Sequence, residues 1–399
     1  MTIRGSARLG QLPGYPLAEI PGIKRRLLDA GVDVIDLGAG DNDTPPPAPV
    51  VAAMGEALAD SAMSKYGFQQ GYFPFREAAV RYVHRRFGHQ FDPTTEVLPL
   101  IGSKDGLAHL PFAFVNPGEV VILPEPGYQA YIGGAVLSGA IPFQYPLDAR
   151  DGFLLELDQV PAATLARTRL VYVNYPNNPT AAVASMAYLE RTVAACRRHG
   201  IVLAYDNAYC DLTFDGYQAP SIFDVPGARD VAVEFFSLSK SFSMTGWRVG
   251  FAIGNPTLIG GLNKVKSYTD TGPFLATQRA GVVALDRAEE FTAPIRDELA
   301  RRRDAGVRAL ATIGLSIESP KAAMYLWVPL PSGIPSAPFM RFALETEGVV
   351  TLPGSGFGPA GEGYFRIALT VGQDRLTDAV GRLGRALAVF QARGDYSAA

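Results

Sequence analysis

Strand-like apolar runs alternate with helix-like stretches through the middle of the chain, and this alternation constrains the fold more than any other feature. A helical stretch around residues 184–199 ends at Gly200, and glycine commonly takes the left-handed position that ends a helix. Repeated strand–helix–strand units predict a mostly parallel, doubly wound α/β sheet with helices on both faces. The apolar runs cover residues 96–101, 119–128, 169–180, 201–209 and 231–236.

Chemically complementary side chains follow these predicted strands. Taken singly, each has an ordinary explanation: Lys240 as a surface charge, Asp206 as a helix cap, Asn178 as part of a turn. Ser103 could equally cap the next helix, and Tyr128 could be a packed aromatic. Those explanations do not account for an amine, a carboxylate, an amide and a phenol at successive strand ends, which meet at one crevice in such folds. The predicted crevice contains Ser103, Lys104, Tyr128, residues 174–180, Asp206, Tyr209 and residues 237–248.

Composition narrows the classes of protein that remain. The 399 residues, 48% of them hydrophobic, suffice for two domains, and a net charge of −3 favours neither nucleic acid nor an anionic membrane as partner. The N-terminus lacks the apolar core of a signal peptide, and no apolar run is long enough to span a bilayer. Two cysteines, of which Cys196 is expected in the core, and four scattered histidines form no metal-ligand pattern. We therefore predict a cytoplasmic protein without a metal site.

The pattern changes after about residue 280. A charged helical stretch over 291–310 precedes short strands within 323–330 and 364–370, which is typical of a smaller α+β domain. The predicted division is a large domain over 45–280 and a small domain formed by 1–44, with an N-terminal arm, and 281–399.

Separated motifs along the chain strongly resemble the fold-type I, class I/II aminotransferases, which use pyridoxal 5′-phosphate. The motifs are "GSKDGLAHL" (102–110), "NYPNNPT" (174–180), "YDNAY" (205–209) and "SLSKSFSMTGWRVG" (237–250). With "PGSGFGPAGEGYFRIALT" (353–370), the first of them is similar to the LL-diaminopimelate branch of the family. Asn42 stands where relatives usually have proline and Ala181 where they have glycine; the first departure bears on substrate specificity.

The resemblance implies a role for each residue of the crevice. Lys240 would carry the cofactor and later move a proton, while Asp206 would pair with the pyridine nitrogen. Tyr209 and Asn178 would hydrogen-bond the ring's 3′ oxygen, and Tyr128 would stack on the ring. The catalytic residues predicted are Lys240, Asp206 and Tyr209. Those predicted to bind the cofactor are Ser103, Lys104, Tyr128, Asn178, Asp206, Tyr209, Ser237, Ser239, Lys240, Arg248 and Tyr66, with the serines and Arg248 on the phosphate.

The resemblance also places the substrate. Arg366 would bind its α-carboxylate, which Gly40 would meet through the backbone and Asn178 would also contact. Tyr15 and Lys104 are the candidates for the distal end of the substrate. Either Tyr66 or Tyr72 would reach the phosphate of the neighbouring subunit, which implies a homodimer with shared sites; core packing is the alternative for Tyr66.

Three functions are compatible with parts of this pattern. The preferred one is transfer of an amino group between an amino acid and a 2-oxo acid, with glutamate/2-oxoglutarate as the exchanging pair and LL-diaminopimelate as leading substrate. Alanine or another amino acid is the alternative within the family, and a β-lyase or cyclopropane-forming synthase would share every cofactor residue. A DNA-binding regulator on this fold would need a winged-helix domain ahead of residue 44, where the sequence shows no basic region for one.

Overall fold

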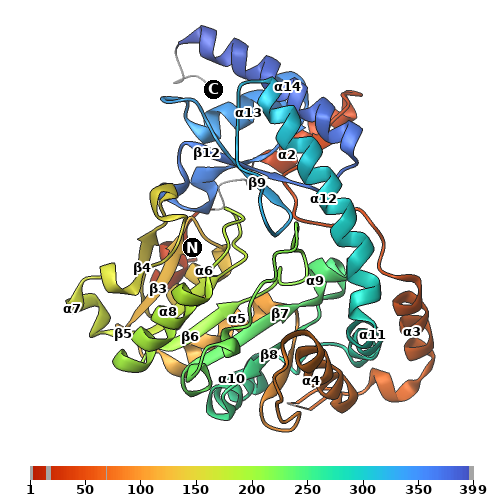
Figure 1. The fold of residues 1–399 in the computed structure, drawn as a ribbon, viewed down its shortest axis with the longest axis vertical. Helices are drawn as coiled ribbons and strands as arrows, with labels where there is room; N and C mark the ends of the chain where they lie inside the picture. Colours follow the sequence, from red (N-terminus) through yellow and green to blue (C-terminus); the bar gives the residue numbers. More distant parts are fainter. Residues whose placement is uncertain (1–2, 15–18, 69, 395–399) are drawn as a thin grey trace.

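A seven-stranded sheet lies at the centre of the computed structural model, which describes residues 3–14, 19–68 and 70–394 (Figure 1). Its strand order is β2-β8-β7-β6-β5-β3-β4, and within this sheet β8 runs antiparallel to both neighbours while the other pairs are parallel. The predicted mostly parallel sheet is confirmed. Its strands are β2 (Val97–Leu100), β3 (Val120–Glu125), β4 (Ile141–Pro146), β5 (Thr168–Asn174), β6 (Val202–Asp206), β7 (Ala232–Ser237) and β8 (Gly250–Gly254).

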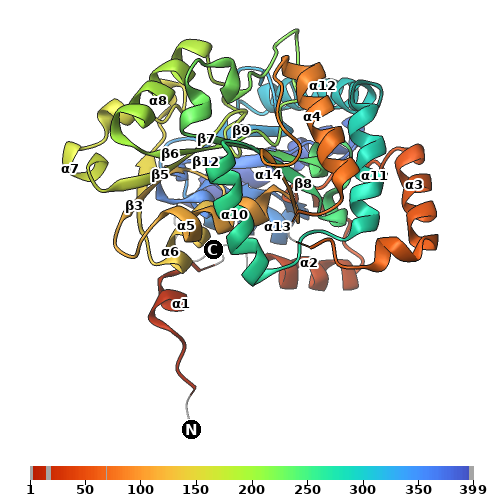
Figure 2. The ribbon, with the colours of Figure 1, turned by 90° about the horizontal axis from the view of Figure 1, so that it is seen from below.

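Helices cover both faces of this sheet, as the predicted double winding requires (Figure 2). Successive strand residues point to opposite faces. In β5, Val171 and Val173 belong to one buried cluster and Leu170 and Tyr172 to another. The main helices of this part of the chain are α3 (Ala48–Ala59), α4 (Phe73–Phe87), α5 (Ser103–Phe114), α6 (Gln129–Ser138), α8 (Met186–His199), α10 (Pro256–Thr269) and α11 (Leu275–Asp286).

A smaller antiparallel sheet lies above the strand ends of the large one in Figure 1. It has the order β11-β12-β9 and packs with three helices around its own buried cluster. The segment β1 pairs with β10, so part of the N-terminal region joins the C-terminal part. The domain boundaries stay a prediction. The elements are β1 (Ile35–Asp36), β9 (Tyr325–Pro329), β10 (Val349–Val350), β11 (Leu352–Pro353), β12 (Tyr364–Ala368), α12 (Ala288–Thr312), α13 (Ser336–Glu347) and α14 (Gln373–Arg393).

Helix α8 begins and ends at residues that are typical of helix ends. Ser185 accepts a hydrogen bond from the Tyr188 backbone N–H at the start of the helix, and Gly200 ends it with a φ of 65°. Cys196 is fully buried in α8, as predicted.

Among the described helices, none combines the length and apolarity that a membrane crossing needs.

A buried carboxyl group lies in the middle of the large sheet. Glu234 on β7 is 0% exposed and accepts hydrogen bonds from Asn207 Nδ2 at 2.7 Å and Ser221 Oγ at 2.5 Å. Burial outweighs these hydrogen bonds and raises the pKa of Glu234 from 4.5 to about 8. Because the unfolded chain has the lower pKa, the stability from this protonated group is complete below pH 4.5 and is lost as pH rises to about 8.

We expect Glu234→Gln to stabilise the protein in alkaline solution. The amide cannot ionise, so its advantage over the wild type should grow by roughly 1.4 kcal/mol per pH unit between the two pKa values and level off above the higher one. Thermal unfolding from pH 5 to pH 9 measures this, with the exposed Glu190→Gln on α8 as the matched control. Parallel Tm profiles for Glu234→Gln and the wild type would show that Glu234 is ionised in the fold.

Candidate active site

One cavity of about 350 Å³ lies where the strands of the large sheet end. It lies between these ends and residues of the small sheet, so both parts of the chain contribute to its wall. Of the predicted residues, it is lined by Gly40, Ser103, Lys104, Tyr128, Asn178, Asp206, Tyr209, Ser237, Ser239, Lys240, Arg248 and Arg366. The structure therefore brings together the side chains that the sequence placed at successive strand ends.

Lys240 lies in the four-residue helix α9 (Leu238–Ser241), immediately after β7. Ser237 begins this helix by accepting a hydrogen bond from the Ser239 backbone N–H at 3.2 Å. The Lys240 ammonium donates to the backbone oxygen of Gly40, and Asn42 Nδ2 donates to the Lys240 carbonyl at 2.8 Å. Hydrogen bonds therefore hold both the side-chain amine and the backbone carbonyl of Lys240, and the residue lines the cavity.

An anion-binding corner forms where α5 begins. Ser103 is the first residue of α5, after Gly102, so it does not cap the helix as its ordinary explanation required. Arg248 lies against Gly102, where a Cβ would lie 2.4 Å from Arg248 Nη2, so a side chain at 102 would displace the guanidinium. Arg248 Nη1 donates to the Thr245 carbonyl at 2.7 Å and lies 3.4 Å from Ser239 Oγ. A helix start, hydroxyls and a guanidinium form a site that suits a phosphate.

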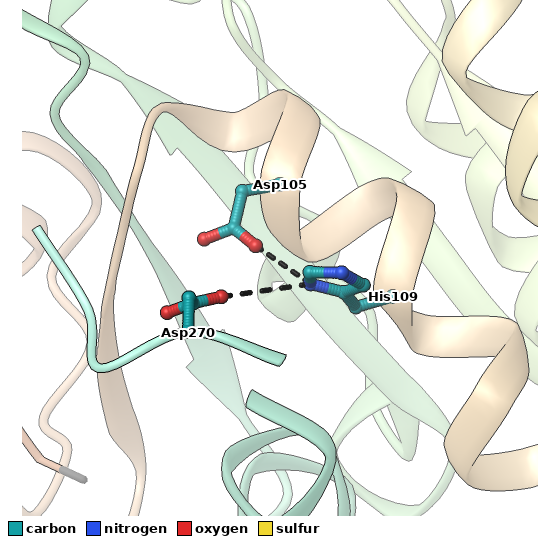
Figure 3. Close-up of side chains that lie close together, drawn as sticks. All are labelled: Asp105, His109 and Asp270. Carbon is teal, nitrogen blue, oxygen red and sulfur yellow. Dashed lines mark hydrogen bonds and ion pairs between the residues drawn. The ribbon is translucent and has the colours of Figure 1, made fainter. Parts of the chain in front are cut away.

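Asp105 anchors this corner from the first turn of α5 (Figure 3). Its carboxylate accepts hydrogen bonds from the Ile101 backbone N–H at 2.9 Å and from the buried ammonium of Lys266. His109 Nδ1 lies 2.7 Å from Asp105 Oδ1 and 4.0 Å from Asp270 Oδ2. Burial raises the pKa of Asp105, but His109 and Lys266 outweigh it and leave the pKa below its ordinary value. The Lys266 ammonium binds both carboxylates, so this cluster already has its cation.

Asp206 ends β6 as a buried carboxylate with one unused oxygen. Tyr131 donates to Oδ2 at 2.7 Å, while Oδ1 has no hydrogen-bond partner among the described residues. Burial raises the pKa of Asp206 to about 6, although the Tyr131 hydroxyl and the Ala208 backbone N–H both lower it. No helix begins at Asp206, so it is not a helix cap. An unused buried carboxylate oxygen at a cavity wall suits a cationic N–H donor of a ligand.

Arg366 lies on β12 of the small sheet and is 5% exposed. Its Nη1 donates to Asn178 Oδ1 at 2.7 Å and its Nη2 to the Gly38 carbonyl at 2.8 Å. The guanidinium also lies over the rings of Tyr325, at 4.2 Å from the ring centroid, and Phe357, at 4.9 Å. These contacts orient the Arg366 guanidinium, which has no ion-pair partner in the described part of the chain. A buried, unpaired guanidinium at the cavity wall suits the carboxylate of a ligand.

Some predicted residues lie elsewhere. Tyr15 lies outside the described residues. Tyr66 does not line this chain's cavity. Its side chain is 69% exposed, which rules out core packing. Tyr72 is partly buried against the core. Asn42, whose departure from the family's proline was expected to bear on substrate specificity, donates to the Lys240 carbonyl and to Ser243 Oγ.

Sequence reasoning missed several side chains of the site. Tyr131 follows Tyr128 by three residues, a helical spacing that could have paired them at one face. Tyr325 and Phe357 were assigned only to the small domain, although both reach the cavity. No local signal identifies these two residues, because the folding of the small sheet over the large one brings them to the site.

Fold and cavity together define an α/β enzyme whose site is built for small molecules that carry acidic groups and an amine. The chain belongs to the class I and II aminotransferase family, whose sequence profile matches residues 32–383. It is 44% identical over 378 residues to the LL-diaminopimelate aminotransferase of Aquifex aeolicus (strain VF5), a match that covers 95% of this chain and 98% of the relative.

Solved structures agree with this assignment. Substrate-bound BacF from Bacillus subtilis has a TM-score of 0.92 and 31% identity, covering 96% of this chain and 98% of BacF. A probable N-succinyldiaminopimelate aminotransferase from Thermus thermophilus has a TM-score of 0.88 and 37% identity, covering 93% of this chain and all of that one. The predicted fold type and the aminotransferase activity are confirmed.

Proposed function

We propose that this aminotransferase binds pyridoxal 5′-phosphate and uses LL-diaminopimelate as its leading amino donor, with glutamate and 2-oxoglutarate as the exchanging pair. The observation that carries the cofactor assignment is the unused oxygen of Asp206, which lines the same cavity as Lys240 and Arg248. A pyridinium N–H and a phosphate on one small ring fit these two ends of the site. When bound, the cofactor supplies an electron sink for the carbanion that forms at the substrate Cα.

Each predicted residue that lines the cavity then has a defined task. Asp206 holds the proton on the pyridine nitrogen, and Tyr209 and Asn178 orient the ring through its 3′ oxygen. Ser103, Ser237, Ser239 and Arg248 hold the phosphate at the start of α5, with Lys104 nearby, and Tyr128 lies against the ring face. Lys240, held by the Gly40 carbonyl, is the amine placed to take the proton from the substrate Cα and return it. Arg366 binds the substrate α-carboxylate, beside the backbone of Gly40.

The charges around the cavity favour a substrate with a second carboxylate. The wall carries four cations against two carboxylates, those of Asp41 and Asp206. A phosphate on Arg248 and an α-carboxylate on Arg366 leave Lys104 without an anionic partner. Lys104 Nζ lies 5.8 Å from the ring centroid of Tyr128, on the cavity wall. It is therefore placed to bind a distal carboxylate, whose burial without a partner would be unfavourable.

The space for a long substrate lies next to the main cavity. A second cavity of about 460 Å³ shares the wall residues Gly127, Tyr128, Gln129, Gly356 and Phe357 with the first. Its other lining residues include Gln144, Ser355 and the N-terminal residues 12–14. These polar groups and the added length suit the second amino-acid end of diaminopimelate. The curated relatives that carry this activity in their names support the same choice.

We expect kcat/KM for LL-diaminopimelate to exceed that for alanine by at least roughly a hundredfold, because a site built to pair polar groups rejects a substrate that leaves them unpaired. Lys104→Ala should narrow this gap mainly by lowering kcat/KM for diaminopimelate. Lys264→Ala, an exposed lysine on α10, is the matched control and should leave the ratio unchanged. The measurement is transfer to 2-oxoglutarate over a panel of amino donors.

Other outcomes of that panel are equally informative. Equal or better use of alanine or of aromatic amino acids would contradict the substrate proposal and leave the family assignment. Release of ammonia and pyruvate without 2-oxoglutarate would identify a β-lyase.

We further propose that the enzyme is a cytoplasmic homodimer of amino-acid biosynthesis, with small molecules rather than nucleic acid or membranes as its partners. Large exposed side chains gather around α11 and the loop before α4. Tyr66 and Phe68 have ring centroids 5.8 Å apart, and a Cβ at Gly67 would lie 2.9 Å from the Leu275 side chain. The exposed set near these elements is Leu58, Tyr66, Phe68, Phe73, Tyr268 and Phe274. A second copy of the chain would cover this surface and place Tyr66 at the neighbouring phosphate.

A further inference from the structure

Tyr325 is a buried tyrosine of the cavity to which none of the tasks above is assigned. It begins β9 and is 2% exposed. Its hydroxyl oxygen lies 2.9 Å from the hydroxyl oxygen of Tyr209, and its ring lies under the guanidinium of Arg366 at 4.2 Å. It thus contacts one residue assigned to the cofactor and one assigned to the substrate.

The surroundings leave Tyr325 little freedom. A Cβ at Gly40 would lie 2.7 Å from Tyr325 Oη, so the backbone of residue 40 presses against the hydroxyl. The rings of Tyr325 and Tyr209 meet edge to face with centroids 5.6 Å apart. In the small sheet, Tyr325 pairs with Ala368 of β12, two register positions from Arg366. The hydroxyl is therefore aimed at Tyr209 by packing from three sides.

The hydrogen count between the two tyrosines sets the direction of their hydrogen bond. Each phenol has one hydrogen to donate. If Tyr209 donates its hydrogen to the cofactor's 3′ oxygen, the hydrogen between the two phenols must come from Tyr325. Burial raises the pKa of Tyr209 far above its ordinary value, so its phenol keeps its proton. In a chain of hydrogen bonds, each bond strengthens the next through polarisation.

We propose that Tyr325 is a positioning residue that orients the hydroxyl of Tyr209 and strengthens its hydrogen bond to the cofactor ring. This inference rests on the proposed function, because the acceptor is the 3′ oxygen of pyridoxal 5′-phosphate. The charged and titratable groups around the pair are Arg366 on β12, Asp206 at the end of β6, Lys240 beyond Gly40, and the phenols of Tyr128 and Tyr131 from α6 and its start. None of them replaces the hydroxyl of Tyr325 as a donor to Tyr209 among the described hydrogen bonds.

The experiment uses Tyr325→Phe, which keeps the ring under Arg366 and removes only the hydroxyl. Weaker donation from Tyr209 stabilises the anionic 3′ oxygen less, so the pH midpoint of the visible absorbance of the substrate-free holoenzyme should rise. We expect a rise of about half a pH unit, a roughly threefold change in the protonation equilibrium. The KM for the amino donor should stay unchanged, because the contact with Arg366 is kept.

The same substitution in a Tyr209→Phe background tests whether Tyr325 acts through Tyr209. We expect no further rise of the midpoint in Tyr209→Phe/Tyr325→Phe compared with Tyr209→Phe alone. An equal rise in both backgrounds, or none in either, would overturn the inference. A wild-type protein that develops no visible absorbance with pyridoxal 5′-phosphate would overturn the proposed function and this inference with it, whereas a normal wild-type spectrum with an unchanged midpoint in Tyr325→Phe would overturn the inference alone.

Discussion

Lys240→Ala is expected to abolish transamination while leaving the fold intact. The lysine amine is the group we propose to move the proton at the substrate Cα, and general acid–base catalysis of this kind contributes up to about 10⁴-fold. Loss of the proposed attachment point for the cofactor adds to this effect. We therefore expect kcat to fall by roughly 10⁴-fold or more, measured as transfer from LL-diaminopimelate to 2-oxoglutarate.

The fold should tolerate this change because the side chain of Lys240 contributes one hydrogen bond, to the Gly40 carbonyl, among the described contacts. Circular dichroism and thermal unfolding of Lys240→Ala should match the wild type, and Lys264→Ala should retain full activity. Substantial turnover by Lys240→Ala would show that another amine performs the proton transfer.

Asp206→Asn is the second substitution with a large expected effect. The amide keeps the shape of the side chain but removes the negative charge that we propose holds the proton on the pyridine nitrogen. That charge matters most as negative charge develops at the substrate Cα, so the loss should lie mainly in kcat. Removing one electrostatic contribution of this kind typically costs about 10²-fold or more.

Tyr131→Phe is the matched control for Asp206→Asn. It removes the hydrogen bond to Oδ2 and leaves the carboxylate and its unused Oδ1 in place. We expect a much smaller loss of kcat for Tyr131→Phe than for Asp206→Asn. Near-normal kcat in Asp206→Asn would show that Asp206 is a structural carboxylate of the β6 end.

The sequence predicted the large sheet and most of the cavity because both depend on local patterns. Buried parallel strands appear as apolar runs, and polar side chains directly after them must meet at one edge. Lys240 and Asp206 were found in this way. Strand β4 was missed because it is an edge strand with two prolines and mostly unburied residues, and β8 because it is a short run between two glycines.

The rest of the site depends on contacts between distant segments. Tyr325 meets Tyr209 across 116 positions of the chain, and no spacing rule connects them. Asn42 was linked to substrate specificity because it stands where relatives have proline, yet its amide binds the Lys240 carbonyl 198 positions away. The charge pairing of Lys266 with Asp105 was equally invisible, since α5 and α10 meet only in the folded chain.

We propose that Lys240 carries pyridoxal 5′-phosphate in the resting enzyme, and chemical trapping tests this directly. Protein loaded with the cofactor is treated with sodium borohydride, which makes the link to a lysine permanent, and is then digested and mapped by mass spectrometry. We predict a yellow protein before reduction and the cofactor mass on the peptide that contains Lys240. Label on another lysine, or no label on protein that has bound the cofactor, would show that Lys240 does not carry it.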